Sequence, residues 1–510
     1  MINNLSLAII IPPHAEPSLP MLGAAQLFGY AKKQGIPANY YDFSIYAKTG
    51  GEVLPYHLET EAHYWKSVNA HKKYFSDRYA TLFPFFSATW DGCDQGNLRW
   101  NFFCDQKEYI DRQQGNRDLI SFFSQFSGFF DNTYFLVSVT FPSQLFDALL
   151  LADYIRKNKK EAIIVFGGGL INSCIQNRDD IHKPLSELVD FISLGEGEFF
   201  IKVISHYSAE GIKKYFSEKC AGISYIVDSA ILKRKLDLNI HLNPPAFSDL
   251  QVYDTPSAVL PYRLNSTCYW NRCAFCTEHS YKSILQTISV QEHVDNLLSL
   301  KREYQTCFFM LQDSAIHPSV LESFCSLILQ SGEDIKWGVN ARFDEKLTDV
   351  LLEKMRAAGC LFLRFGMESG SDRVLRLMKK GITIEEAKRV LKKTRSLGIL
   401  THCYFIVGFP GENTQDRELT RKFLLDDNVF PDSFNISTFI SYKIAPINGA
   451  TEKCACSDLC WDLYETPPHG KDYSGFIDGL TAEFERNHPI HKTLLSPAHT
   501  LTLYEKTRRW

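Results

Sequence analysis

The sequence predicts an α/β protein with two parallel sheets. An N-terminal Rossmann-like open sheet is followed by a partial (β/α)6 barrel of the TIM type and a C-terminal extension. Two observations predict this fold. Short apolar, β-branched runs alternate with helical periodicity in two separate blocks, at residues 5–205 and 256–440. Glycines or polar residues follow many of these runs, where α/β sheets bind their ligands.

Length and composition limit the class of protein. A chain of 510 residues is too long for one core, and 45% hydrophobic with 22% charged residues is typical of a globular protein. A net charge of −4 gives no basic field for nucleic acid, and no apolar run approaches a membrane span. The start of the sequence does not read as a signal peptide, and 14 cysteines, mostly scattered, suit a reducing compartment. We therefore expect a cytoplasmic protein without nucleic-acid or membrane partners.

The first domain is predicted to span residues 1–205. Gly167-Gly168-Gly169 and Gly195-Glu196 follow two of its strands and could border a ligand. No Gly-x-Gly-x-x-Gly opens the first helix, which argues against a nicotinamide cofactor. The predicted strands are 5–11, 37–43, 134–140, 162–166 and 191–194, and the predicted helices are 21–34 and 144–157.

Two segments interrupt the α/β pattern. Residues 45–132 are rich in aromatics and predict a mainly helical insertion, most of whose aromatics pack against the sheet. Residues 206–255 predict a linker that contains a small hairpin, with a turn at Asp228-Ser229. The Asn243-Pro244-Pro245 passage favours extended chain before the next domain.

The second domain is predicted over residues 256–440. One strand leads into the cysteines near residue 270, and five more β-α units follow. Six units are too few for a closed eightfold barrel, so we expect one open along its side. The further strands are predicted at 307–311, 336–340, 362–366, 402–407 and 433–439, and the helices at 290–304, 319–330, 348–358, 372–378, 384–397 and 414–425.

Three cysteines, Cys268, Cys273 and Cys276, follow the first strand of this barrel. Such close thiols without secretory features favour metal ligation over a disulfide. A structural zinc would need a fourth ligand, and His279 is the candidate. Three thiolates can instead hold three irons of a [4Fe–4S] cluster and leave the fourth iron open. Polar or glycine residues follow the other strands too, at Asp313, Asn340 with Arg342, Glu368-Ser369 and 408–412.

The cysteine loop resembles that of the radical S-adenosylmethionine (SAM) enzymes, Cys-x3-Cys-x-aromatic-Cys, with Phe275 at the aromatic position and one extra residue in the first gap. Further passages resemble the branch of this family that carries an N-terminal cobalamin-binding domain. The resemblance covers roughly residues 5–45 and 134–440. The passages are 165–169, 195–198, 260–261, 366–371, 377–381 and 407–412.

This resemblance implies a [4Fe–4S] cluster on Cys268, Cys273 and Cys276 that cleaves SAM to a 5′-deoxyadenosyl radical. It also implies cobalamin, C-methylation of an unactivated carbon in a biosynthetic pathway, a small-molecule or peptide substrate, and an electron donor such as flavodoxin or ferredoxin. Two alternatives stay open. One is a radical reaction without methylation, such as cyclisation, rearrangement or aminocarboxypropyl transfer. The other is a zinc-stabilised α/β binding protein without catalysis.

The resemblance also implies site residues. Those expected to contact SAM are Phe275, Asn340, Arg342, Glu368, Ser369, Lys380, Gly408 and Pro410. Those expected to contact cobalamin are Ser138, Thr140, Phe141, Gly167, Gly168, Gly195 and Glu196. The Asp-x-His-x-x-Gly motif that supplies a cobalt ligand in many cobalamin proteins is absent, and His14 does not match it. Either cobalamin binds without a protein histidine, or the domain has lost the cofactor.

The C-terminal region, residues 441–510, breaks the barrel pattern and is expected to cover the open side of the barrel. It contains a second close group of thiols, Cys454, Cys456 and Cys460. They could form an auxiliary cluster, a zinc site or a thiol that handles substrate, or they could be unligated cysteines in a loop.

Overall fold

The computed structural model divides the chain into two compact units. The first comprises Met1–Asp254, Ser283–Thr287 and Glu452–Leu463, and the second comprises Thr255–Lys282, Ile288–Thr451 and Tyr464–Trp510. The structure describes residues 5–12, 18–45, 125–174, 188–212, 226–253, 255–280, 283–426, 428–439, 441–442, 445–448, 464–465, 473–487 and 501–502.

The first unit contains a parallel sheet of six strands, because its short apolar runs are separated by helices long enough to return the chain. The strand order is β2-β1-β3-β4-β5-β6. The order reverses once, between β1 and β3, so the topological switch point lies at the carboxyl ends of these two strands. The strands are β1 (Leu7–Ile11), β2 (Ala38–Asp42), β3 (Tyr134–Ser138), β4 (Ile163–Gly167), β5 (Phe191–Leu194) and β6 (Ile226–Asp228).

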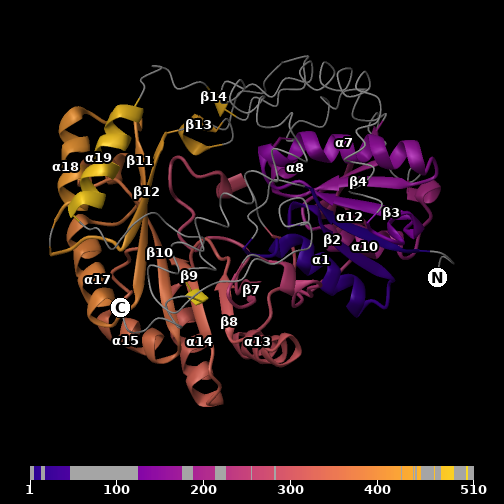
Figure 1. Cartoon of the computed structure of the whole chain (residues 1–510), viewed down its shortest axis with the longest axis horizontal. Coiled ribbons are helices and arrows are strands. Elements are labelled where there is room, and N and C mark those ends of the chain that lie inside the picture. The colour runs from indigo at the N-terminus through magenta and orange to yellow at the C-terminus, as the bar shows by residue number, and fades with distance from the viewer. Residues whose placement is uncertain are drawn as a thin grey trace. The chain divides into compact units, whose positions relative to one another are not determined.

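Helices cover both faces of this sheet, which explains why β1 is buried along its whole length. Figure 1 shows α7 and α8 on one face and α1, α10 and α12 on the other. The helices are α1 (Leu22–Lys33), α7 (Pro142–Asn158), α8 (Gly169–Cys174), α10 (Gly197–Ile204) and α12 (Ser229–Leu236). The expected Rossmann-like open parallel sheet is confirmed.

The predicted hairpin between residues 222 and 232 is wrong. Ile226–Asp228 forms β6, which pairs in parallel with β5, and α12 begins at Ser229. The Asp228 side chain accepts hydrogen bonds from the backbone N–H groups of Ala230 and Ile231, so the pair that reads as a turn is a helix N-cap. Residues 226–236 therefore belong to the sheet unit rather than to a linker.

Most of the predicted aromatic insertion, residues 46–124, lies outside the described residues. At its described end, a short helix, η1 (Phe129–Asp131), brings aromatic rings onto the sheet. Phe129 lies edge-on to Tyr41 and Phe135, with ring centroids 5.1 and 5.3 Å apart. The described aromatics of this segment thus belong to the core.

The second unit contains the partial barrel, and its six parallel strands follow one another in the order β12-β11-β10-β9-β8-β7. Their carboxyl ends share one edge, as the sequence predicts. The strands are β7 (Val259–Tyr262), β8 (Phe308–Leu311), β9 (Lys336–Ala341), β10 (Cys360–Glu368), β11 (Leu400–Val407) and β12 (Ser433–Thr438).

Amphipathic helices form the outer layer of this barrel (Figure 1). Their starts are marked by side-chain caps, for example Ser289 and Glu292, which form a reciprocal capping box on α13. The helices are α13 (Val290–Tyr304), α14 (Pro318–Ser331), α15 (Asp349–Ala357), α16 (Asp372–Leu377), α17 (Ile384–Ser396) and α18 (Thr414–Leu424). Shorter elements are η2 (Leu250–Val252) in the first unit, and η3 (Thr277–Ser280), η4 (Pro446–Asn448), β13 (Ser441–Tyr442) and β14 (Tyr464–Glu465) in the second.

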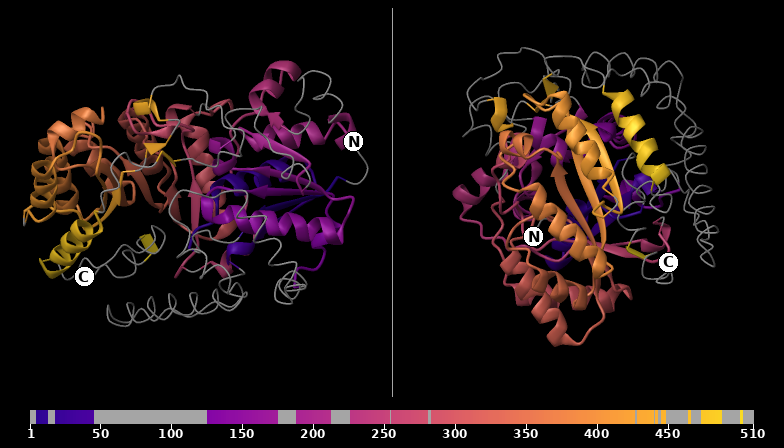
Figure 2. Two further views of the ribbon diagram at one scale, coloured as in Figure 1. Left: turned by 90° about the horizontal axis from the view of Figure 1, so that it is seen from above. Right: turned by 90° about the vertical axis from the view of Figure 1, so that its left-hand side faces the viewer.

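The C-terminal region adds one further helix to the outer layer, α19 (Ser474–Asn487). Its Phe484 packs on Phe434 of β12 with ring centroids 4.8 Å apart, and its Glu483 pairs with Arg421 of α18. Figure 2 shows α19 in yellow beside the last strands of the barrel. Cys454, Cys456 and Cys460 lie outside the described residues. None of the described helices is long and apolar enough to span a membrane.

Candidate active site

The loop that carries the three cysteines begins where β7 ends, and a buried carboxylate holds its start. Asp313, which follows β8, accepts hydrogen bonds from the backbone N–H groups of Leu264 and Asn265. Burial raises the pKa of the Asp313 carboxyl to about 6, although these N–H groups counteract the rise. Asp313 thus fixes the path of the chain that leads to Cys268.

The extra residue in the first cysteine gap forms a bulge with a defined shape. Asn271 adopts a left-handed backbone with φ 43°. The indole N–H of Trp270 donates to the carbonyl of Lys379 at 3.0 Å, and the Arg342 guanidinium lies 4.4 Å from the Trp270 ring centroid. Gly381 lies directly against the Trp270 ring, because a Cβ there would come within 2.0 Å of it. The loop is therefore one residue longer than Cys-x3-Cys-x-aromatic-Cys, and the contacts of Trp270 hold it in place.

We expect Gly381→Ala to destabilise this loop more than a matched substitution. The left-handed backbone costs an alanine about 1 kcal/mol, and overpacking against Trp270 adds about 1–3 kcal/mol. Gly332 at the end of α14 has the same φ of +66°, but a Cβ placed there would meet nothing within 4 Å, so Gly332→Ala isolates the backbone cost. Guanidinium unfolding of both variants measures the difference, and equal losses of stability would contradict the packing argument.

The three thiols lie on this loop and none of them forms a disulfide. Burial raises the pKa of Cys273, while nearby Lys380 and Arg342 lower it. Burial likewise raises the pKa of Cys276 to about 11, with Cys273 and Cys268 contributing. Within the described residues, no group of three or more His, Cys, Asp or Glu side chains is gathered closely enough to hold a metal ion. The side chain of His279, the fourth ligand in the zinc interpretation, lies outside the described part of the chain.

An ion pair marks the carboxyl end of β10. Glu368 Oε1 lies 2.7 Å from Lys380 Nζ, and both side chains are almost completely buried. Glu368 also has φ 67° beside a register shift in β10, a strained conformation that is often found at functional sites. Lys380 Nζ lies 5.8 Å from the Phe275 ring centroid. The structure thus brings Glu368, Lys380 and Phe275 together beside the cysteines.

Two further residues that are predicted to contact SAM, Asn340 and Arg342, lie at the carboxyl end of β9. Asn340 donates from its amide to the carbonyl of Asp313 at 2.8 Å. Arg342 is buried and donates to the carbonyl of Lys380, while its Nε has no hydrogen-bond partner among the described residues. Asn271 Oδ1 is a second buried polar atom without a described partner. Two polar atoms beside the thiols are therefore available to a ligand.

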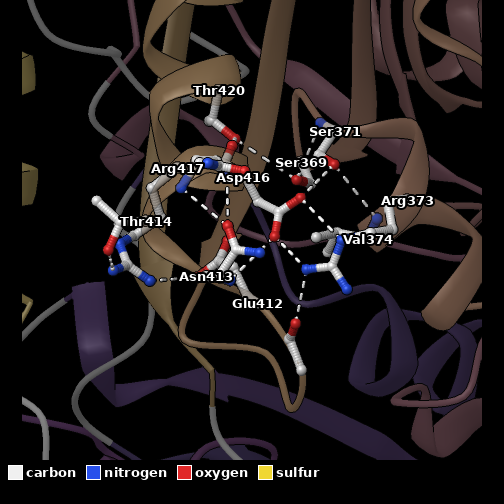
Figure 3. A network of polar contacts seen from close by, with 12 residues as sticks. Ser369, Ser371, Arg373, Val374, Glu412, Asn413, Thr414, Asp416, Arg417 and Thr420 are labelled. Atoms are coloured by element: carbon white, nitrogen blue, oxygen red, sulfur yellow. Dashed lines mark hydrogen bonds and ion pairs between the residues drawn. The ribbon is translucent and has the colours of Figure 1, made fainter.

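Ser369 belongs to a polar network that joins the loop after β10 to α18 (Figure 3). Its hydroxyl is fully buried, lies 3.5 Å from that of Thr420 and accepts from the N–H of Ser371. Asp416 is the centre of the network, because its carboxylate accepts from Ser371, from Arg373 and from the backbone N–H of Asn413. The network fixes the backbone next to Glu368, and Ser369 is directed into it.

We expect Asp416→Asn to destabilise the second unit by about 2 kcal/mol, from the buried bonds to Ser371 and Asn413, since exposed Arg373 adds little. Burial alone would raise the pKa of Asp416, but hydrogen bonds from Arg373, Asn413 and Ser371 lower it to about 2. This stability is present above pH ~4 and is lost as the pH falls toward 2. Guanidinium unfolding at pH 7 and pH 3 tests both statements, with exposed Asp478→Asn as the control. Equal stability of the two variants at pH 7 would contradict them.

The turn after β11 completes this edge of the barrel. Gly408 has φ 84°, donates from its N–H to Glu412 at 2.6 Å, and would clash with Tyr473 if it carried a Cβ. Phe409 packs with Phe275, ring centroids 6.5 Å apart, whereas Pro410 is exposed. Gly408 thus lies between Glu412 and Tyr473, and Pro410 lies at the surface.

The predicted cobalamin contacts of the first unit also gather at one edge, the carboxyl ends of β3, β4 and β5. Gln144 holds this edge together: its amide donates to the carbonyl of Pro12, and its Oε1 accepts from the N–H groups of Thr140 and Phe141. Phe141 is 44% exposed, which is unusual for so large an apolar side chain. The switch point therefore presents an aromatic ring to solvent.

The glycines of this edge support neighbouring loops. A Cβ on Gly168 would come within 2.5 Å of the Val139 carbonyl, and one on Gly195 would strike Ser229. Gly167 accepts a hydrogen bond from the N–H of Val139. Glu196 accepts from the N–H of Ile284 at 3.1 Å. Packing between adjacent loops thus accounts for these positions without a ligand.

Sequence reasoning missed the positions of Trp270 against Gly381, of Asp416 in its network, and of Arg364 and His402 within the barrel. Alternation of polar residues along β10 and β11 could have indicated the last pair. The contacts of Trp270, and those of Asp416 with Ser371 and Arg373, join residues more than 40 positions apart and leave no local signal, whereas the Asn413–Asp416 capping box is local.

Parts of this chain are similar in sequence to known proteins. Residues 265–424 match the radical SAM superfamily. The chain is 28% identical over 221 residues to the anaerobic magnesium-protoporphyrin IX monomethyl ester cyclase of Rubrivivax gelatinosus, covering 42% of this chain and 40% of that protein. It is 30% identical over 180 residues to the cytidylyl-2-hydroxyethylphosphonate methyltransferase of Streptomyces wedmorensis, covering 33% of each. The chain thus matches less than half the length of these two relatives.

Among solved structures, the fold is similar to that of the radical SAM methyltransferase TsrM from Kitasatospora setae, whose structure contains cobalamin and a [4Fe–4S] cluster. The TM-score is 0.61 with 99% of both chains covered. At 13% identity, this likeness shows a shared fold.

Proposed function

We propose that this chain, whose residues 265–424 belong to the radical SAM superfamily, binds a [4Fe–4S] cluster through Cys268, Cys273 and Cys276 and catalyses cobalamin-dependent C-methylation. The observation that carries this proposal is the position of the cysteine loop, whose Cys273 and Phe275 lie beside the buried Glu368–Lys380 pair at the carboxyl edge of a partial barrel. When bound, the cluster with SAM supplies a carbon-centred radical, and cobalamin supplies a methyl carrier.

The chain's own residues then bind and orient SAM. The Glu368 carboxylate would accept from the amino group of SAM, and the Arg342 guanidinium, whose Nε has no hydrogen-bond partner among the described residues, would bind the SAM carboxylate. Phe275, packed against Phe409 and Val374, excludes water from the side of the cysteine loop. Asn340 and Lys380 complete the polar wall, and Gly408 with Pro410 borders the adenine through its backbone.

The first unit binds cobalamin at its switch point, with Ser138, Thr140 and exposed Phe141 as the contacts. The described carboxyl ends of its strands carry no histidine. Ser138, Thr140 and Phe141 would hold cobalamin at this edge, where it would supply a carrier for the methyl group.

A single reconstitution experiment tests the proposal. Anaerobically reconstituted protein is incubated with hydroxocobalamin, desalted, and assayed with labelled SAM and dithionite. We expect about four irons per chain, retained corrin absorbance, and both 5′-deoxyadenosine and S-adenosylhomocysteine as products. Stoichiometric zinc without iron would contradict the proposal, as would the absence of 5′-deoxyadenosine.

A second reaction, a radical cyclisation without methyl transfer, is favoured by one observation. A relative that the chain matches over 221 residues is a cyclase. This reaction predicts 5′-deoxyadenosine without S-adenosylhomocysteine, so the same product analysis distinguishes it from methylation.

A further inference from the structure

A row of polar side chains crosses the second sheet from strand to strand. Asn340 of β9 is in register with Arg364 of β10, Arg364 with His402 of β11, and His402 with Ser433 of β12. Residues in register on parallel strands point to the same face, and neighbouring strands lie about 4.8 Å apart. These four residues therefore form one layer, which we call the Arg364 layer.

The Arg364 layer faces the interior of the barrel. Residues of opposite parity pack against the outer helices: Trp337 on Phe324 at 5.5 Å between ring centroids, Phe405 on Phe423 at 6.1 Å, and Phe434 on Phe484 at 4.8 Å. Because successive side chains of a strand alternate between faces, the layer lies on the face that these helices do not cover.

The layer carries a cation without a described counter-ion. Arg364 Nε is buried without a hydrogen-bond partner, and no Asp or Glu among the described residues forms an ion pair with it. Burial and the neighbouring Arg364 lower the pKa of His402 to about 3, so this imidazole is neutral. Other arginines of the chain have acidic partners, for example Arg156 with Asp190 and Arg373 with Asp416. Arg364 as a whole is half-buried, but desolvating part of a guanidinium without an anion is still costly, which indicates that an anion belongs beside it.

The neutral histidine can supply a second donor. His402 Nδ1 lies 3.0 Å from the Ser433 hydroxyl, and His402 Nε2 has no hydrogen-bond partner among the described residues. In the tautomer in which Ser433 donates to Nδ1, the Nε2–H is a donor that needs an acceptor. The Tyr404 ring lies edge-on to His402 at 4.4 Å, and burial lowers the pKa of Arg364 while the nearby Tyr404 side chain counteracts this.

Arg364 is half-buried, and the next layer toward the carboxyl edge lies between it and the Glu368–Lys380 pair. There Gly366, Tyr404 and Asn435 are in register, and Asn435 is exposed. Gly366 has no side chain, and a Cβ on it would meet Glu368 Oε1 at 2.5 Å and Lys380 Nζ at 2.7 Å. The Arg364 layer thus lies one step of two residues, about 7 Å, below the Glu368–Lys380 pair.

We propose that Arg364, with His402 and Tyr404, binds an oxyanion of the substrate, a carboxylate or a phosphate, inside the barrel. That this oxyanion belongs to the substrate rests on the proposed function, whereas the binding site itself does not. The substrate then carries its anionic group at the depth of Arg364 and presents its reacting carbon to the edge where Glu368 and the cysteines lie.

The test uses the reconstituted full chain saturated with S-adenosylhomocysteine, so that the SAM carboxylate cannot account for the signal. Benzoate, phenyl phosphate and neutral benzamide are titrated by saturation-transfer NMR and calorimetry. We expect one or both anions to bind and benzamide not to bind, and the stronger anion identifies the group. Arg364→Gln is expected to weaken binding about tenfold or more. Absence of anion binding, or equal binding of benzoate and benzamide, would overturn the proposal.

Two further variants keep the result interpretable. Tyr404→Phe removes only a hydroxyl, so it weakens anion binding about three- to tenfold even if Arg364→Gln fails to fold. Exposed Arg302→Gln on α13 is the matched charge control and leaves binding unchanged. Reductive cleavage of SAM without substrate is measured in parallel. Arg302→Gln retains it, and absence of this reaction in the unsubstituted chain would contradict the proposed function while leaving the anion site standing.

Discussion

Cys273→Ser is expected to abolish reductive SAM cleavage, with product falling at least 10³-fold, to the detection limit, and iron content falling with it. Serine would remove one of the three thiolates that we propose as ligands of the cluster. Cys273 is the most deeply buried of the three and lies next to Lys380 and Arg342, so the proposed thiolate ligand would also be an anion beside two cations. Iron determination and the product assay after identical anaerobic reconstitution measure the effect.

Cys307→Ser provides the matched control. Cys307 precedes β8, is half-buried and forms no disulfide. The Cys307→Ser variant should keep its iron content and its rate of SAM cleavage within about twofold, because replacement of a half-buried residue outside the site costs little stability. Equal iron in Cys273→Ser and Cys307→Ser would show that Cys273 is not a ligand.

The sequence predicted the second unit more closely than the first, for a physical reason. Helices α13, α15, α17 and α18 begin after Ser289, Thr348, Thr383 and Asn413, each of which accepts hydrogen bonds from the first turn. Such caps are readable from local sequence. Asp228-Ser229 is equally compatible with a turn and with a cap, and only pairing of β6 with β5 decided between them.

Some residues of the candidate site can likewise be predicted from local sequence, and others cannot. The cysteines, Glu368 and the Gly408 turn are local motifs, so the sequence located them. The Arg364 layer depends on the register of four strands, and a shift of one residue would turn Arg364 toward the helices. Strand register is set by the packing of the whole sheet, which local patterns do not contain.

Glu368→Gln is expected to weaken SAM binding about 10- to 100-fold while leaving iron content unchanged. Glutamine keeps the shape of the side chain but removes the charge that would accept from the SAM ammonium, a charge-assisted bond of about 1.5–3 kcal/mol. The charge also neutralises Lys380, and an unpaired buried lysine would destabilise the loop. Equilibrium binding of SAM to the unreduced, reconstituted protein measures the affinity. Parallel loss of iron would assign Glu368 to the support of the cysteine loop.

The double variant Glu368→Gln with Lys380→Met separates the two roles of Glu368. Breaking one partner of a buried ion pair costs about 3–5 kcal/mol of stability, whereas removing both charges costs far less. If the pair only supports the fold, the double variant should regain both stability and SAM affinity relative to Glu368→Gln. If the pair contacts SAM, the double variant regains stability but not affinity, because methionine restores the packing while neither substituted side chain can bind the charged groups of SAM. Recovery of SAM binding in the double variant would therefore refute the ligand role, even though Glu368 lies beside the cysteines.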